Sequence, residues 1–75
     1  MRTDQKRVAH RGMIGLVPVV SFRPFVLWDK GKVVGEHLTL GGLREAQAKR
    51  VREGGRAAEA YSWDFGDSRW RRIHV

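Results

Sequence analysis

Two pairs of apolar runs, each joined by a short turn-forming segment, predict two β-hairpins. In the first pair, residues 25–28 and 32–40 are rich in Val, Leu and aromatic side chains, and the segment between them contains Gly31. In the second pair, aromatic and polar residues alternate over residues 61–65, and a basic and apolar run over 69–75 follows a Gly-Asp-Ser turn. Short connections that contain Gly are typical of antiparallel hairpins, so we expect about four strands.

Strict alternation along these strands predicts which side chains share a face of the sheet. In the first hairpin, we expect Val34 and Glu36 to lie on the same face. In the second hairpin, alternation places Arg69, Arg71, Ile73 and Val75 on one face and Trp70, Arg72 and His74 on the other.

Residues 43–53, which lie between two Gly-Gly pairs, predict the single α-helix of the chain. They are almost all good helix formers, and Gly suits both the entry of a helix and its C-terminal cap. We expect Glu45 in the first turn and basic residues in the last turn, where they complement the helix macrodipole. The apolar stripe is narrow, so the helix can lie on a sheet with most of its circumference in water; the stripe consists of Leu43, Ala46 and Val51.

The apolar run over residues 13–20 is too short to span a membrane, and Pro18 interrupts it. No small-residue cleavage site follows, so we expect a buried strand rather than a signal peptide, and a cytoplasmic protein. Pro18 and Pro24 cannot donate to a strand ladder, and they predict an edge strand, a bulge or a break into two short strands. Residues 1–12 are polar and basic without sustained periodicity, which predicts a flexible arm.

These elements predict one α+β domain over residues 13–75, preceded by the basic arm at residues 1–12. We expect a small antiparallel sheet of about four strands with one α-helix packed on it, in the order hairpin, helix, hairpin. A chain this short buries only about 60% of its unfolded surface. Without Cys it has neither a disulfide nor a Cys-based zinc site to support the core. Support by a partner or by homo-oligomerisation is therefore an open alternative.

The charge of the chain is the first indication of its function. Fifteen Lys and Arg residues stand against eight Asp and Glu residues, which gives a formal net charge of +7. A charge of this size on a small domain attracts polyanions whatever the fold. The sequence therefore predicts a protein that binds rather than one that breaks bonds.

Catalytic chemistry has no recognisable grouping of residues in the sequence. None of the serines stands in the context of a nucleophile elbow. The histidines, His10, His37 and His74, lie far apart and show no metal-ligand spacing. The Asp residues fall largely in expected turns, where Asp is common for backbone reasons. We expect no enzyme, no cofactor and no metal site.

Two basic stretches supply the candidate binding residues. Arg guanidinium groups bind phosphates in a bidentate way and indole rings stack on bases, so residues of both types can contact nucleic acid. The helical stretch contributes Arg44, Lys49, Arg50, Arg52 and Arg56, and the second hairpin contributes Arg69, Trp70, Arg71 and Arg72. Alternatively, the helix cations form a solvated face and the aromatic residues build the core. We favour the core for Tyr61, Trp63 and Phe65 and leave Trp70 open between the two interpretations.

Residues 25–53 resemble a layout found in small proteins of phages and mobile elements. The shared features are a hairpin with a Gly turn (Asp29-Lys30-Gly31-Lys32), a Thr39-Leu40 pair and a helix that opens with Glu45-Ala46. Arm-type DNA-binding domains of phage integrases look like this, and so do compact anti-CRISPR inhibitors, which block nucleic-acid-handling complexes without catalysis. In the arm-type domains the sheet precedes a terminal helix, whereas here an aromatic hairpin follows the helix. The inhibitor class is therefore at least as good a match, and the resemblance assigns no individual functional residue.

We therefore expect a non-catalytic accessory protein that binds and inhibits or modulates a host nucleic-acid-handling complex in the cytoplasm of a host cell. Its cations would occupy an acidic protein surface or compete for nucleic acid. One alternative is a direct DNA- or RNA-binding module that uses the basic helix and the Arg/Trp hairpin. A second alternative is a small structural subunit whose charge serves assembly. We expect no membrane partner.

Overall fold

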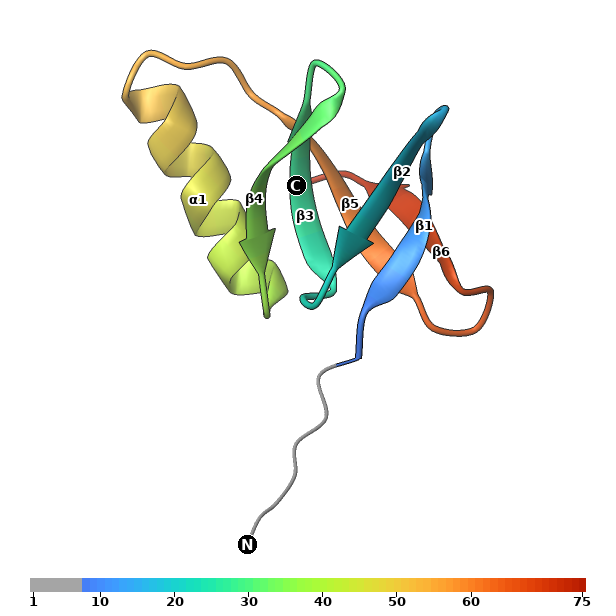
Figure 1. The fold of residues 1–75 in the computed structure, drawn as a ribbon. Coiled ribbons are helices and arrows are strands. Elements are labelled where there is room, and N and C mark those ends of the chain that lie inside the picture. Colours follow the sequence, from blue (N-terminus) through green and yellow to red (C-terminus); the bar gives the residue numbers. More distant parts are fainter. Residues whose placement is uncertain (1–7) are drawn as a thin grey trace, which may run out of the picture.

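Three layers make up the protein in the computed structural model, which describes residues 8–75 (Figure 1). The central layer is a four-stranded antiparallel sheet with the strand order β4-β3-β5-β6, and a separate two-stranded hairpin, β1–β2, lies on one side of it. The helix α1 lies on the other side. The elements are β1 (His10–Ile14), β2 (Val17–Ser21), β3 (Phe25–Asp29), β4 (Lys32–His37), α1 (Leu40–Arg52), β5 (Glu59–Asp64) and β6 (Arg69–Ile73). The predicted α+β class is confirmed.

The strand β3 is buried on both faces, because neighbouring side chains of a strand point to opposite sides of the sheet. Val26 and Trp28 pack toward the β1–β2 hairpin, in a cluster with Ile14, Val19 and Trp70. Leu27 packs toward α1, in a second cluster with Leu43, Ala58 and Ala60. The domain therefore has two small cores rather than one.

The two predicted hairpins are confirmed, and their turns explain the local sequence. In the β3–β4 turn, Lys30 and Gly31 both have positive φ angles, 51° and 81°. A turn of this kind suits the twist of an antiparallel pair and favours Gly. The second hairpin pairs Trp63 with Trp70 and Asp64 with Arg69.

The predicted common face for Val34 and Glu36 is wrong, because β4 contains a register shift. Leu27 pairs with Gly35 while Trp28 pairs with Val33, so Val34 is an extra residue opposite β3. Such a bulge breaks the alternation of side chains. Val34 packs in the cluster beneath α1, whereas Glu36 reaches the opposite layer, where it accepts a hydrogen bond of 2.6 Å from the Ser21 hydroxyl of β2.

The helix begins three residues earlier than predicted. Thr39 is the N-cap, and its side-chain oxygen accepts a hydrogen bond of 3.0 Å from the Gly42 amide. A Thr cap satisfies a backbone donor that has no partner within the helix, so the Gly41-Gly42 pair belongs to the first turn. Glu45 consequently lies outside the first turn, contrary to expectation. The basic last turn is confirmed, and it contains Lys49, Arg50 and Arg52.

The N-terminal part of the chain differs most from the prediction. The apolar run over residues 13–20 is not one buried strand, because Gly15, with a φ angle of 62°, and Leu16 form the turn between β1 and β2. The expected arm extended to residue 12, but His10–Gly12 already belong to β1; residues 1–7 of that arm lie outside the described residues. The break near Pro24 is confirmed as the boundary between β2 and β3. The additional hairpin supplies a second sheet that covers the face opposite α1.

An aromatic cluster fastens this hairpin to β5 and β6. The imidazole ring of His10 stacks on Trp63, with ring centroids 5.3 Å apart, and Trp63 meets Trp70 edge to face at 4.9 Å. The indole Nε1 of Trp70 donates a hydrogen bond of 3.3 Å to the Val19 carbonyl. The core interpretation therefore holds for Tyr61 and Trp63, which pack against this cluster, whereas Phe65 is 69% exposed.

We predict that Leu43→Ala lowers the free energy of unfolding by about 2–5 kcal/mol, because Leu43 is fully buried and the change leaves a cavity. Chemical denaturation followed by tryptophan fluorescence measures this. The matched control is Val51→Ala on the same helix, whose half-exposed side chain predicts a change within about 0.5 kcal/mol. If Leu43→Ala does not fold, Leu43→Met should cost less than about 1.5 kcal/mol. Equal effects of the Leu43 and Val51 truncations would contradict the assignment of Leu43 to the helix–sheet core.

Candidate binding surface

Asp29 joins the β3–β4 turn to the C-terminal half of α1. Its carboxylate forms an ion pair of 2.9 Å with the Arg50 guanidinium and a longer one of 3.5 Å with Arg56. Arg50 also donates to the carbonyl oxygen of Arg56 at 2.9 Å. The Asp29 side chain is only 17% exposed, so water screens these pairs less than it screens pairs at the open surface. The contacts hold the turn, the helix end and the following loop together.

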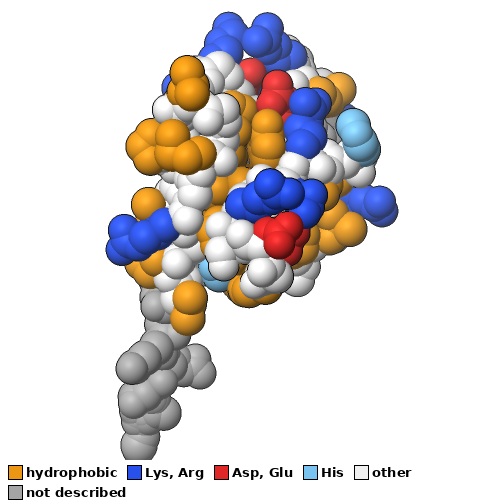
Figure 2. Space-filling view, turned by 90° about the vertical axis from the view of Figure 1, so that its right-hand side faces the viewer, with side chains coloured by type: hydrophobic (Ala, Val, Ile, Leu, Met, Phe, Trp, Pro, Cys, Tyr) orange, Lys and Arg blue, Asp and Glu red, His pale blue; other side chains and the backbone are white. Residues whose placement is uncertain are grey.

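This junction concentrates positive charge at one end of the molecule. We call the group the cationic end; its members are Lys30, Lys32, Lys49, Arg50, Arg52 and Arg56. Within residues 8–75, four of them form no ion pair: Lys30, Lys32, Lys49 and Arg52. Figure 2 shows Lys and Arg side chains gathered at the upper end, where the β3–β4 turn lies in Figure 1. Asp29 is the acidic residue at the centre of this group, and Arg50 and Arg56 largely neutralise it.

The basic residues of β6 are paired with acids instead. Arg71 forms ion pairs of 2.6 Å with Asp64 and 2.9 Å with Asp67. Arg69 lies 3.6 Å from Asp67, and Arg72 lies 3.8 Å from Glu59. The hydrogen bond from Arg71, followed by the one from the Asp67 amide, lowers the pKa of the Asp64 carboxyl below its ordinary value of 3.8. The surface around β6 is therefore close to charge balance, and it offers little attraction to a polyanion.

Trp70 is a core residue, which corrects its place among the candidate binding residues. Its side chain is 6% exposed, and its ring lies in the aromatic cluster beneath the β1–β2 hairpin. An indole in this position cannot stack on a base. The strand alternation predicted for β6 is correct, and it is the added hairpin that buries the Trp70 face.

The structure brings together only part of the predicted site. Lys49, Arg50, Arg52 and Arg56 meet at the cationic end, but β6 with its arginines lies at the opposite edge of the sheet from β4. Arg44 is exposed and unpaired among the described residues, and it stands two helical turns before Arg52. The helix and the second hairpin therefore do not form the common phosphate-binding face that their charges suggested.

Lys30 and Lys32 were missed by the sequence analysis, which treated them as turn residues. The link that makes them part of a larger surface is the ion pair between Asp29 and Arg50, which are 21 positions apart in the sequence. No local pattern indicates such a contact. The signal that was available is the pair of Lys residues that flank Gly31 at the tip of a hairpin, where side chains project into solvent.

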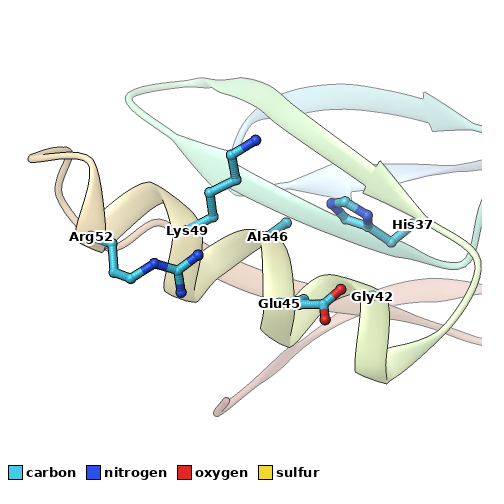
Figure 3. Close-up of a pocket in the computed structure, with 6 residues that line it drawn as sticks. All are labelled: His37, Gly42, Glu45, Ala46, Lys49 and Arg52. Carbon is cyan, nitrogen blue, oxygen red and sulfur yellow. The ribbon is translucent and has the colours of Figure 1, made fainter.

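A groove lies between β4 and α1, next to the cationic end (Figure 3). Its volume is about 460 Å³, and it is lined by His37, Gly42, Glu45, Ala46, Lys49 and Arg52. We call it the β4–α1 groove. In Figure 3, Lys49 extends from the helix toward β4, and the His37 ring extends from β4 toward the helix. The Nε2 atom of His37 is buried without a hydrogen-bond partner in the part of the chain that the structure describes.

The outer face of the β1–β2 hairpin exposes apolar side chains. The register pairs Met13 with Pro18 and Arg11 with Val20 on the face that points away from the sheet. Met13 and Val20 are about half exposed, and Leu16 at the tip is 94% exposed. Single exposed apolar residues are common, but neighbouring ones on one face are typical of interaction surfaces.

Ser21 is a buried hydroxyl that is fully hydrogen-bonded. The Ser21 hydroxyl donates to Glu36 and accepts a hydrogen bond from the Arg23 amide at 3.0 Å. Over residues 8–75, no three His, Asp or Glu side chains are grouped as metal ligands would be. The helix α1 is too short and too polar to cross a membrane.

Comparison with known proteins gives no family assignment. No protein-family model matches the sequence, and no solved structure matches the chain.

We predict that Asp29→Asn lowers the free energy of unfolding by about 1–2 kcal/mol, between the values of exposed and buried ion pairs. The same change frees Arg50 and Arg56, so binding to heparin should become stronger at fixed salt. Denaturation and heparin-column elution measure the two effects. The control Asp67→Asn makes the same charge change at an exposed pair and should cost less than about 1 kcal/mol. A stability loss for Asp67→Asn as large as that for Asp29→Asn would contradict the anchoring role of Asp29.

We predict an Asp64 pKa below 3.8 in an NMR titration of the carboxyl carbon, and a rise toward that value in Arg71→Gln. Because the folded-state pKa is the lower one, the stabilising contribution is present above the unfolded-state pKa. It is lost as the pH falls through the folded-state value. The control Arg72→Gln removes a guanidinium that pairs with Glu59 and should leave the Asp64 pKa unchanged. If Arg71→Gln leaves the Asp64 pKa unchanged, the ion pair between Arg71 and Asp64 does not persist in solution.

Proposed function

We propose that this protein is a non-catalytic binding protein that attaches to an anionic surface of a host nucleic-acid-handling complex and inhibits or modulates it. The observation that carries the proposal is the cationic end, where Lys30, Lys32, Lys49 and Arg52 stand together without acidic partners among the described residues. Unpaired cations on a rigid support attract and orient an anionic partner.

Two features support a protein surface as the target rather than nucleic acid alone. The apolar outer face of the β1–β2 hairpin, with Met13, Leu16 and Val20, suits a protein interface and has no use on a phosphate backbone. Sequence-tolerant binding of single strands relies on aromatic stacking, yet Trp70 is buried and Phe65 lies in the β5–β6 turn, away from the cationic end. Charge and apolar surface together favour a protein partner.

The resemblance of residues 25–53 to phage and mobile-element proteins gives this proposal its specific form, an inhibitor of the anti-CRISPR kind that acts in the host cytoplasm. Such an inhibitor needs no chemistry of its own. It competes by occupying a surface, so small size and high charge are sufficient for the task.

We predict that the tagged protein retains a host nucleic-acid-handling complex from lysate after nuclease treatment. Lys30→Gln/Lys32→Gln should weaken retention about tenfold, because unpaired charges at an interface promote association. The matched control, Arg69→Gln/Arg72→Gln, removes the same charge from paired positions and should change retention less than about threefold. Quantitative mass spectrometry of the captured proteins measures both. The proposal fails if no protein partner survives the nuclease or if the two double variants behave alike.

Direct DNA or RNA binding is the second candidate, and the same unpaired cations favour it. If the four free cations contact phosphates, the logarithm of the binding constant for duplex DNA should fall with the logarithm of salt concentration with a slope of about −3.6. Fluorescence anisotropy at several salt concentrations measures the slope. A flat salt dependence together with a nuclease-resistant protein partner would select the first candidate.

A further inference from the structure

We propose that the β4–α1 groove binds a short extended peptide whose acidic residues lie at one end, as the recognition segment of the partner protein. This inference rests on the proposed function, because it names the part of a protein partner that this chain would hold. It differs from that function in using His37, Glu45 and the two small residues Gly42 and Ala46 as well as cations.

The shape of the groove fits an extended chain. The lining residues of α1 follow Gly42 at intervals of three or four positions, with Glu45 and Ala46 side by side, so they form one stripe along the helix. From Gly42 to Arg52 this stripe is about 15 Å long, at about 1.5 Å per residue of helix. An extended peptide rises about 3.3 Å per residue, so four or five residues would fill the groove. Gly42 and Ala46 leave room on the helix wall for a backbone to approach.

The opposite wall offers main-chain contacts. In residues 8–75, β4 pairs with β3 alone and is an edge strand of the sheet. The outward amide and carbonyl groups of an edge strand can bond to an added segment. The bulge at Val34 disrupts regular pairing, and the Glu36 carbonyl already accepts a hydrogen bond of 3.5 Å from the Arg23 guanidinium. The main-chain contacts of a peptide are therefore confined to the strand end at His37, the residue of β4 that lines the groove.

His37 adds a polar group that lacks a partner within the described chain. Its Nε2 atom is buried, and a buried polar atom without a hydrogen bond destabilises the structure that contains it. The ring is held close to the strand because Gly35 has no side chain; a Cβ atom there would lie 3.1 Å from Nε2. Because Nε2 is buried beside Gly35, a backbone amide or carbonyl of a bound peptide would supply the missing hydrogen bond once the ring rotates Nε2 into the groove.

The charges along the groove favour a peptide over nucleic acid. Glu45 stands toward the N-terminal end of the helix stripe, and Lys49 and Arg52 follow about 6 Å and 10 Å further along. A nucleic-acid strand is negative at every unit and would be repelled by Glu45. A peptide with Lys at one position and acidic residues two and four positions later matches the order, because same-face side chains of a strand are about 6.6 Å apart.

The test uses NMR titration of the full chain with synthetic hexapeptides blocked at both ends. The probe is Lys-Thr-Glu-Val-Glu-Thr, and its control has the same composition with Lys moved between two Glu residues. We expect saturable shifts of the His37, Gly42 and Ala46 amides and of the His37 Nε2 resonance with the probe, and weaker binding of the control. Shifts that do not saturate, or that the control peptide matches, would overturn the proposal.

Substitutions that reverse the charge of groove residues test whether these residues bind the peptide or only support the structure. Lys49→Glu should weaken the probe about tenfold, while Arg44→Glu on the same helix outside the groove should change it less than about twofold. The Glu45→Lys variant should bind a peptide in which Glu replaces the single Lys of the probe more tightly than it binds the probe itself. The control Glu53→Lys adds the same charge outside the groove and should not share that preference. Equal preferences of the two variants would show that net charge, rather than the groove, selects the peptide.

The double variant Lys30→Gln/Lys32→Gln distinguishes failure of this inference from failure of the proposed function. Both residues lie outside the groove, so the variant should bind the probe normally while its retention of the host complex falls about tenfold. If the wild type retains a host complex but does not bind the probe, the peptide-binding role of the groove is rejected and the proposed function is kept. Binding of the probe without a nuclease-resistant partner would reject the proposed host target and keep the groove.

Discussion

The burial of β3 on both faces is the constraint on which the rest of the structure depends. A strand with the sequence Phe-Val-Leu-Trp cannot leave either face in water without exposing a large apolar side chain. One helix covers Leu27, and the β1–β2 hairpin covers Val26 and Trp28. Neither cover is large, so each depends on one or two buried anchors, namely Leu43 on the helix and Ile14 with Val19 on the hairpin. In a domain of this size, nearly every element is needed to cover the two faces of β3.

This arrangement decides which charges are available for binding. The side chains of β6 that face the hairpin layer include Trp70, and the hairpin removes it from solvent. The β6 arginines remain at the surface but meet acids from β5 and the β5–β6 turn at short range. At the other edge of the sheet, Asp29 is shared by Arg50 and Arg56, and the neighbouring Lys residues form no ion pair within residues 8–75. Of the two basic stretches in the sequence, one is thus paired with acids at the surface, whereas the other keeps cations that form no ion pair within residues 8–75.

The cationic end and the β4–α1 groove are neighbours because α1 runs antiparallel to β4. Lys49 and Arg52 belong to both, since they stand where the helix stripe of the groove reaches the charged end. In the two proposals, adjoining residues would therefore supply both the general attraction to an anionic surface and the selection of a particular segment. Long-range charge brings a partner close and accelerates association, whereas short-range contacts in a groove determine which partner stays. In the proposed function, Glu45 would disfavour uniformly negative ligands, a role that net charge alone cannot provide.

The features that could be predicted from the sequence are those determined by residues close together along the chain. Gly31 and the Gly-Asp-Ser segment locate two turns, and the helix formers between the Gly pairs locate α1, because each signal acts over a few residues. The helix starts before the two glycines because Thr39 caps it, and its side-chain hydrogen bond to Gly42 stabilises the first turn. The burial of Trp70 depends on Val19, which lies 51 positions earlier in the chain. The cationic end depends on an ion pair between residues 21 positions apart. Charge counts and strand alternation carry no information about such distant neighbours, so they could identify the basic residues but not which of them remain unpaired.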